Sequence, residues 1–377
     1  MQTKVLLAIR SLQPYSGGAQ RQLIEIAKML CETGIVVEII TLDSDDVTED
    51  AKLHYRIEEI PLHNIPPIVG RGQGKFNTLL QRTNRLSCIY SLISKVKPTI
   101  IISFMFGAFS FVAIPAKLKR ISCVLAERNS PFMYRQPQYR RQRILLFLFM
   151  MLARKITIQF PGYAHEYPRF LRSRIRVIPN SVTKQMKREP RMVDPLGKLV
   201  IGFVGRMEIQ KNPTAAIETA AILRNEGYPF ILRMYGEGSC LEKIREKIRG
   251  ERLEDYCELI TEYIPSAEIF NELDVLLHPA VWEGFPNAVG ESLAFGIPVV
   301  GFAECDGLRE LVNDGENGKL VSRRKGSQGL ADAVREILVL RNMSGETMMM
   351  NRCQNSIKEY DPERVKDAWY SFITEMI

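Results

Sequence analysis

Two glutamates, Glu283 and Glu291, stand eight positions apart in the stretch WEGFPNAVGESLAFGIPVVG, residues 282–301. Two carboxylates across a break in the chain can accept hydrogen bonds from two sets of hydroxyls, such as the vicinal hydroxyls of a ribose and those of a second sugar. The spacing alone does not select this pair. Three other glutamate pairs are also eight apart: Glu218 with Glu226, Glu246 with Glu254, and Glu254 with Glu262.

The context of Glu283 and Glu291 separates them from the other pairs. The apolar run DVLLHPA, Asp274–Ala280, predicts a buried strand, and Pro286-Asn287 begins a helix that Gly296 and Pro298 end. Glu283 is therefore expected in the loop after the strand, and Glu291 about one turn into the helix. Loop and first turn can line one ligand, whereas the other pairs fall on expected surface helices or run from a helix into a strand.

Two cations follow another predicted strand in GFVGRMEIQKNP, residues 202–213. Arg206 comes directly after the strand, and Lys211 lies five residues later, before a helix. Arginine offers a planar fork to two oxygens and lysine a mobile point charge, so this pair suits a diphosphate. Two solvated loop cations are the alternative interpretation.

Glycine turns occupy the corresponding places in both halves of the chain. Gly17 and Gly18 follow the first predicted strand, and Gly236 and Gly238 follow a later one. Glycines let backbone N–H groups approach a phosphate closely at a helix N-terminus. Tight strand-to-helix turns would explain the same glycines, and the pattern is not the G-x-G-x-x-G dinucleotide fingerprint.

Strands and helices alternate along the whole chain. Continuous β-branched runs predict strands buried on both faces of parallel sheets, and we expect two tandem doubly wound Rossmann-like α/β domains whose ligands bind in the cleft between them. The predicted strands are Lys4–Arg10, Ile35–Leu42, Thr99–Phe104, Cys123–Glu127, Lys155–Phe160, Leu199–Gly205, Phe230–Gly236, Cys257–Tyr263, Asp274–Ala280 and Ile297–Phe302. The predicted helices include Ala19–Cys31, 213–226, 239–249 and helical material from about 327 to the end.

The polar, basic stretch KQMKREPRMVDPLGK divides the two domains. We expect an N-terminal domain over 1–183, a linker over 184–198, a C-terminal domain over 199–360, and a last helix, 361–377, that crosses back to the N-terminal domain.

The amino-acid composition limits the class of protein only broadly. The 377 residues are 46% apolar and 25% charged, which is ordinary for a globular protein, and the run after Met1 is strand-like, so we expect no signal peptide. The seven scattered cysteines indicate reduced thiols and no metal site.

The two halves of the chain differ in charge. Residues 1–180 carry a net charge of +14 and the remainder −6. The first half therefore favours anionic partners such as phosphorylated substrates, nucleic acid or an acidic membrane; the alternative is a solvated basic surface.

These motifs together, in this order, resemble glycosyltransferase family 4. The resemblance is carried by the glycine turn near Gly17, by G-R-x(4)-K at 205–211, and by E-G-F-P-N-x(3)-E at 283–291 followed by FGIPVVG; NSV at 180–182 and NDGENGKLV at 313–321 also fit. It covers most of the chain and is strongest over 199–321. It implies the GT-B fold and a retaining transfer from a nucleotide sugar that needs no metal or other cofactor.

The resemblance also implies roles for individual residues. Arg206, Lys211 and Glu283 would be catalytic: the two cations would hold the donor diphosphate and Glu283 the transferred sugar, while Glu291 would hold the ribose. The implied donor site comprises Gly17, Gly18, Arg206, Lys211, Gly238, Ile264, Glu283, Pro286, Asn287, Ala288 and Glu291. Many members have a histidine in the N-terminal domain where this chain has AERNS, residues 126–130; Arg128 is therefore an open candidate for contacting the sugar or a phosphorylated acceptor.

Two further patterns have plainer explanations. Asp43-Ser44-Asp45 has the D-x-D form that binds Mn²⁺ or Mg²⁺ in transferases of another fold, but the tandem architecture does not support that fold. His278 precedes Pro279 at the end of a buried strand, where a packed, hydrogen-bonded histidine is expected rather than a catalyst.

The stretch RQPQYRRQRILLFLFMMLARK, residues 135–155, places Arg140, Arg141 and Arg143 before ten apolar residues. That run is too short to span a bilayer, which takes about 20 apolar residues. A helix resting on an anionic membrane surface fits, and so does a core helix with a solvated basic end.

We therefore expect a hexosyltransferase that uses a nucleotide sugar, with UDP favoured, and a lipid-linked or surface-glycan acceptor. We expect it in the cytoplasm, bound peripherally to the cytoplasmic face of the membrane, and without a nucleic-acid partner. A nucleotide-sugar epimerase or hydrolase of the same fold, and a non-catalytic nucleotide-sugar-binding protein, are the alternatives.

Overall fold

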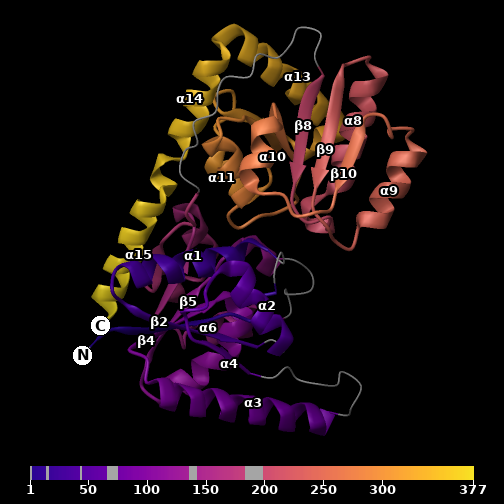
Figure 1. Ribbon diagram of the computed structural model, residues 1–377. Helices are drawn as coiled ribbons and strands as arrows, with labels where there is room; N and C mark the ends of the chain where they lie inside the picture. The colour runs from indigo at the N-terminus through magenta and orange to yellow at the C-terminus, as the bar shows by residue number, and fades with distance from the viewer. Residues whose placement is uncertain (1, 14–16, 43–44, 66–74, 136–141, 183–197) are drawn as a thin grey trace. The chain divides into compact units, whose positions relative to one another are not determined.

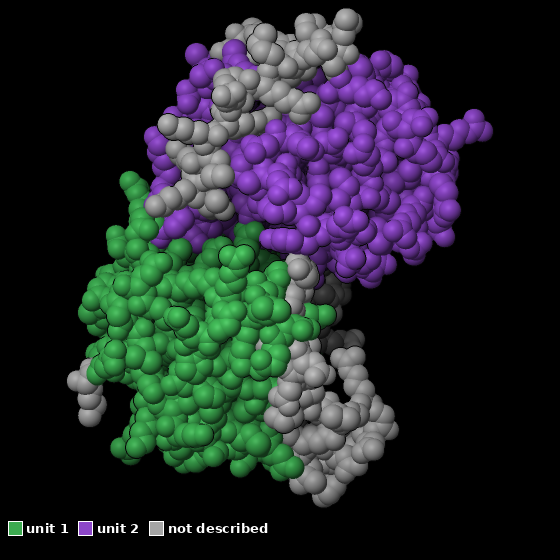
Figure 2. Space-filling model, viewed as in Figure 1, with its two compact units in different colours: residues 1–180, 363–377 green, residues 181–362 purple. Residues whose placement is uncertain are grey.

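The computed structural model describes residues 2–13, 17–42, 45–65, 75–135, 142–182 and 198–377. The chain divides into two compact units, one made of Met1–Asn180 with Glu363–Ile377 and the other of Ser181–Pro362 (Figure 2). The linker predicted over 184–198 lies outside the described residues except for Lys198.

Unit 1 is built on a parallel sheet in the order β3-β2-β1-β4-β5-β6-β7. Its strands are β1 (Lys4–Ala8), β2 (Val36–Thr41), β3 (Leu62–Asn64), β4 (Ile100–Phe104), β5 (Ser122–Ala126), β6 (Lys155–Ile158) and β7 (Ile175–Val177). Its helices are α1 (Gly18–Glu32), α2 (Asp45–Tyr55), α3 (Lys75–Val96), α4 (Met105–Leu118), α6 (Arg143–Met150), α7 (Arg169–Arg172) and α15 (Pro362–Met376), with short 3₁₀ turns at Pro131–Arg135 and Pro161–Glu166. Helices α1 and α15 cover one face of the sheet, and α3 and α4 cover the other (Figure 1).

Unit 2 has a second parallel sheet in the order β10-β9-β8-β11-β12-β13. Its strands are β8 (Leu199–Val204), β9 (Phe230–Tyr235), β10 (Cys257–Ile260), β11 (Val275–His278), β12 (Val299–Phe302) and β13 (Gly318–Val321). Its helices are α8 (Pro213–Asn225), α9 (Leu241–Gly250), α10 (Ser266–Glu272), α11 (Asn287–Ala294), α12 (Asp306–Leu311), α13 (Gly326–Ser344) and α14 (Glu346–Ser356), with 3₁₀ turns at Ile209–Lys211, Arg323–Lys325 and Lys358–Tyr360.

Both sheets are doubly wound, and this confirms the predicted fold class. In unit 1 the strand order reverses between β1 and β4, and in unit 2 between β8 and β11. Connections leave such a junction in opposite directions, so the loops at the carboxyl ends of the two junction strands leave a crevice where ligands of open α/β sheets bind. The structure therefore places a candidate ligand site of unit 2 after β8 and β11.

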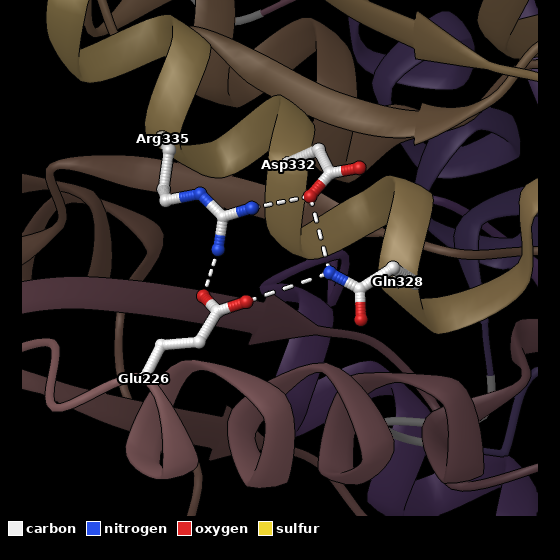
Figure 3. Close-up of polar contacts among 4 residues, drawn as sticks. All are labelled: Glu226, Gln328, Asp332 and Arg335. Atoms are coloured by element: carbon white, nitrogen blue, oxygen red, sulfur yellow. Dashed lines mark hydrogen bonds and ion pairs between the residues drawn. The ribbon is translucent and has the colours of Figure 1, made fainter.

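One polar network ties the end of α8 to α13 (Figure 3). Arg335 pairs with both Glu226 and Asp332. Gln328 Nε2 donates to Asp332 Oδ1 at 3.2 Å and reaches Glu226 Oε1 at 3.5 Å. These side chains are partly exposed, so each pair contributes at most about 1 kcal/mol. Helix α8 is held mainly by the apolar packing of residues such as Ile217 and Val334 in the core of unit 2.

The last helix, α15, is part of the core of unit 1. Trp369 is fully buried among the apolar side chains that line β1, β2 and β4. Its ring lies 6.5 Å from that of Phe104 and 6.0 Å from that of Phe372, between centroids. The C-terminal segment therefore completes a core that the first 180 residues begin.

Replacing Trp369 should destabilise unit 1 far more than replacing its exposed neighbour. We expect Trp369→Ala to lower the free energy of unfolding by about 3–5 kcal/mol, because it leaves a large cavity in the core. Tyr370→Ala, on the solvent side of the same helix, should change it by about 0.5 kcal/mol or less. Urea unfolding of the whole chain, followed by circular dichroism, compares the two; equal effects would contradict the core role of α15.

Candidate functional site

The junction strands of unit 2 bring two loops together. Strands β8 and β11 pair in parallel, with Val275 opposite Ile201, so the loop that begins at Gly205 and the loop that begins at Pro279 leave the same edge of the sheet. The loops are also bonded to each other: Val281 N donates to Gln210 O at 2.8 Å, and Gln210 Nε2 donates to Trp282 O at 2.9 Å. This pairing positions both predicted sets of polar residues, although they lie some 70 residues apart in the chain.

Lys211 and Glu283 form an ion pair at the centre of these loops. Lys211 ends a 3₁₀ turn, and Asn212 after it adopts the left-handed conformation (φ 53°, ψ 52°) before Pro213 opens α8. Asparagine tolerates that conformation and proline suits the first turn of a helix, so the local sequence specifies the bend. Both charged side chains are largely buried. Because they are in contact with each other, one small ligand that reached the cation would also reach the carboxylate.

His278 lies beneath this pair at the end of β11. It is buried, and its Nε2 stands 3.8 Å from Glu283 Oε1 with no hydrogen-bond partner among the described residues. Burial, and then the positive charge of Lys211, lower the pKa of His278 well below its usual value. The imidazole is therefore neutral near pH 7, and the expectation of a packed histidine holds, but without a hydrogen bond at Nε2.

Arg206 lies on the exposed side of the same loop. Its neighbours hold the loop in place: Met207 N donates to Glu237 O at 2.7 Å, and the Glu208 carboxylate accepts from the backbone N–H and the hydroxyl of Ser239. Those two bonds lower the pKa of Glu208 despite its partial burial. Arg206 is thus an exposed cation on a restrained backbone, close in sequence to Lys211.

The glycines after β9 have a packing role. A Cβ on Gly236 would lie 2.3 Å from Gly205 O, and one on Gly238 would lie 2.5 Å from Met207 O; both glycines have positive φ, 132° and 154°. The loop after β9 therefore contacts the Arg206 loop backbone to backbone, which requires glycine. This gives Gly238 a structural role in the loop, and its predicted contact with a donor stays a prediction.

Glu291 lies where the sequence indicates, in the first turns of α11, which Pro286 precedes and Asn287 begins. Its carboxylate is buried, and Oε2 accepts a hydrogen bond from Ser266 Oγ at 2.9 Å. Ser266 is the first residue of α10 and follows Ile264 by two positions, so the structure brings Ile264 near Glu291. Asn287 and Ala288 are half-buried at the start of α11.

The Glu283 loop packs closely against α12. A Cβ on Gly307, near the start of α12, would lie 2.4 Å from Gly284 O, so the loop carbonyls pack directly on that helix. Sequence reasoning identified neither this contact nor Ser266, since both residues lie more than 20 positions from the glutamates they support and carry no local motif.

The remaining predicted site residues belong to unit 1. Gly17 precedes α1 and Gly18 is its first residue, which places them after β1 as predicted, while residues 14–16 lie outside the described chain. Asp43 and Ser44 of the D-x-D run also lie outside it. Within the described residues no group of three histidine, cysteine, aspartate or glutamate side chains is arranged to hold a metal.

Arg128 is buried inside unit 1. Its guanidinium donates to Ile178 O at 2.8 Å, to Thr157 Oγ1 at 3.1 Å and to Asn180 Oδ1 at 3.3 Å, and it lies over the ring of Trp369. Burial lowers the pKa of Arg128 to about 9, against the raising effect of Glu127. These contacts join β6 to the segment after β7, so Arg128 has a bracing role whether or not it also contacts a ligand.

Two family models match the chain. Residues 16–185 match the model described as Glycosyltransferase Family 4, and residues 198–339 match Glycosyl transferases group 1. The first segment contains strands β2 to β7 of unit 1, and the second contains strands β8 to β13 of unit 2.

Curated relatives agree with the family models. A Campylobacter jejuni protein named GalNAc-alpha-(1->4)-GalNAc-alpha-(1->3)-diNAcBac-PP-undecaprenol alpha-1,4-N-acetyl-D-galactosaminyltransferase is 22% identical over 376 residues, 96% of each chain. A putative colanic acid biosynthesis glycosyltransferase, WcaL of Escherichia coli, is 35% identical over 136 residues, 34% of this chain and 33% of that protein.

Solved structures share the fold over the whole chain. Anabaena HepE in complex with UDP-glucose has a TM-score of 0.80 at 17% identity, covering 99% of this chain and all of that one. The pneumococcal O-GlcNAc transferase GtfA, in complex with UDP and GlcNAc, has a TM-score of 0.80 at 11% identity, covering 100% of this chain and 99% of that one.

The neutral, buried state of His278 predicts a pH dependence of stability. The unfolded chain takes up a proton at this histidine below about pH 6.5, whereas the folded unit does not, so stability falls with decreasing pH. Between pH 7.5 and 5.5 this histidine should account for a loss of about 1.4 kcal/mol in the free energy of unfolding.

Urea unfolding in a Trp369→Phe background, where Trp282 of unit 2 is the one remaining tryptophan, measures that loss. His278→Gln should remove it, and His165→Gln, at an exposed position of unit 1, should not. An unchanged pH dependence in the His278 variant would show that the imidazole takes up its proton as readily in the folded protein as in the unfolded chain.

Proposed function

Because the chain belongs to glycosyltransferase family 4 and is a GT-B glycosyltransferase, we propose that it transfers a hexose or an N-acetylhexosamine from a UDP-sugar to a lipid-linked or surface-glycan acceptor. Support for the donor comes from HepE and GtfA, whose structures hold UDP with glucose or GlcNAc. Support for the acceptor comes from the Campylobacter relative, whose name specifies a glycan on undecaprenyl diphosphate.

The observation that carries this proposal is the Lys211–Glu283 pair at the β8–β11 junction, with exposed Arg206 in the same loop as Lys211. In a retaining transfer the bond from the anomeric carbon to the diphosphate breaks, and the acceptor oxygen bonds to the same face of that carbon. The departing diphosphate gains negative charge and can take the proton of the acceptor hydroxyl. Arg206 and Lys211 would stabilise that charge, since preformed cations in a partly dry site require little reorganisation.

The two glutamates would orient the donor. Glu283 would accept hydrogen bonds from hydroxyls of the transferred sugar, and its ion pair with Lys211 would couple the sugar and diphosphate ends of the donor. Glu291 would accept the ribose hydroxyls, with Ser266 holding its carboxylate in orientation. The backbone at Pro286, Asn287 and Ala288 would add N–H groups from the start of α11.

The acceptor places the enzyme at a membrane in this proposal. A polyprenyl-linked glycan stays in the bilayer, so the transferase would bind peripherally to the anionic cytoplasmic face. None of the described helices is long and apolar enough to cross a bilayer.

A nucleotide-release assay tests the transfer. Incubation with UDP-GlcNAc, UDP-GalNAc or UDP-glucose should release UDP only when a polyprenyl diphosphate-linked glycan is added, with the sugar recovered on the lipid. Release of UDP and free sugar without acceptor would identify a hydrolase. Binding of UDP without turnover of any of these donors, in the presence of membrane lipid extract, would identify a non-catalytic binding protein.

Removing either proposed diphosphate contact should slow transfer strongly. We expect Arg206→Ala and Lys211→Ala each to lower kcat about a hundredfold, equivalent to ~3 kcal/mol, because each loses a charge-assisted contact that strengthens as the diphosphate departs. Lys243→Ala, which removes a cation from the exposed side of α9, is the matched control and should retain full activity. Near-normal turnover in both test variants would rule out the diphosphate assignment.

Transfer should continue in the presence of EDTA. The proposed site neutralises the diphosphate with Arg206 and Lys211, so a divalent ion would have no necessary role. Activity lost on chelation and restored by Mn²⁺ would contradict this and direct attention to Asp43 and Asp45, with Asp43→Asn and Asp45→Asn as the variants to compare.

A further inference from the structure

Helix α6 has two different faces. Phe147 and Met150 are buried in unit 1, and the ring of Phe149 lies 5.8 Å from that of Phe106 and 5.9 Å from that of Phe109, both on α4. These contacts fasten the inner face of α6 to α4. The apolar run therefore is not a helix buried on all sides.

The outer face of α6 is apolar and exposed. Ile144 is 72% exposed, Leu145 68%, Leu148 48% and Met151, just after the helix, 44%. These positions follow the spacing i, i+1, i+4 and i+7, which places them in one stripe about 10 Å long. Single exposed apolar residues are ordinary, but a contiguous stripe indicates a binding surface.

Cations stand at both ends of this stripe. Arg143 opens α6, and exposed Arg154 follows its last turn. Arg174 Nη1 closes the helix by donating to Met151 O at 3.0 Å and Ala153 O at 2.6 Å. No acidic residue occurs between Arg143 and Arg154, so the surface suits a partner that is anionic at its boundary and apolar just beneath.

A second copy of the chain fits this surface poorly. In a twofold dimer through α6 the helices would lie antiparallel, and Arg143 of one copy would approach the cations at the opposite end of the other, with no carboxylate on either helix to compensate. The interface of an anionic bilayer supplies both phosphate groups and an acyl layer.

We propose that α6 is the membrane-docking element of the protein. Ile144, Leu145, Leu148 and Met151 enter the boundary between headgroups and acyl chains, and Arg143 and Arg154 contact lipid phosphates. This inference rests on the proposed function only for its biological purpose, access to a lipid-linked acceptor. The docking itself can be measured without any sugar.

The dependence of vesicle binding on salt concentration separates the apolar contribution to binding from the electrostatic one. Co-sedimentation with vesicles of phosphatidylglycerol and phosphatidylcholine should show that Ile144→Ser with Leu148→Ser lowers partitioning about a hundredfold at both low and high ionic strength. Replacing Arg140, Arg141 and Arg143 together by Ser should lower it about a hundredfold at low ionic strength only; the first two of these lie outside the described residues. Leu53→Ser, at an equally exposed apolar residue of α2, is the matched control and should bind normally.

A fluorescent reporter provides a second readout that does not depend on the polar substitutions. Leu145→Trp should shift its emission to the blue and be quenched by brominated acyl chains when vesicles are added, whereas Leu53→Trp should do neither. Unchanged partitioning in the Ile144/Leu148 variant would overturn the proposal, and so would a reporter tryptophan in Leu145→Trp that stays exposed to solvent on vesicle-bound protein. A dimer in sedimentation velocity that the Ile144/Leu148 variant dissociates would overturn it as well.

The two proposals can fail independently. Transfer to a water-soluble acceptor analogue should be equal in wild type and in the Ile144/Leu148 variant, because α6 carries no residue of the donor site. Loss of transfer in both proteins would contradict the proposed function and leave the vesicle result to decide docking.

Discussion

The pairing of β8 with β11 is the constraint on which the candidate site depends. It joins two loops that are remote in sequence at one edge of the sheet, and the bonds made by Gln210 hold them together. Only this arrangement allows Lys211 and Glu283 to meet while His278 remains buried and neutral beneath them. The sheet core, rather than the loops themselves, therefore sets the separation of the charged groups.

Ten strands were predictable from sequence, and three strands at the edges of the sheets were not. All ten predicted strands occur, within one to three residues at their ends, since a continuous β-branched run between glycine and proline signals has few other solutions. Most side chains of strands β3, β7 and β13 are not fully buried, so their sequences lack the continuous apolar run by which the other strands were predicted. They pair because a neighbouring strand already presents unpaired backbone groups, which is a tertiary effect.

The candidate site also has features that the sequence predicted and features that only the fold revealed. The places of Glu283, Arg206 and Lys211 after their strands, and of Glu291 in its helix, followed from the sequence, because strand ends and helix starts are local features. The ion pair between Lys211 and Glu283, and the hydrogen bond from Ser266 to Glu291, required the fold. Gly238 shows the limit of a glycine motif: the sequence allowed close approach to a ligand or a tight turn, and the structure adds a third role, packing against the backbone of Met207.

The positive charge of residues 1–180 is only partly available to a ligand. The net charge of +14 in residues 1–180 suggested an anionic partner for that half, yet several of these cations serve the chain itself. Arg172 donates to the carbonyls of Tyr167 and His165, and Arg174 donates to carbonyls at the end of α6. Cations at the ends of helices can donate hydrogen bonds to the last carbonyls, which have no partner within the helix. Net charge therefore overstates how much positive surface is available to a ligand. What distinguishes Arg143 and Arg154 is their position beside an exposed apolar stripe. The joint occurrence of charge and apolar exposure, rather than charge alone, is the basis for the proposal that α6 contacts lipid.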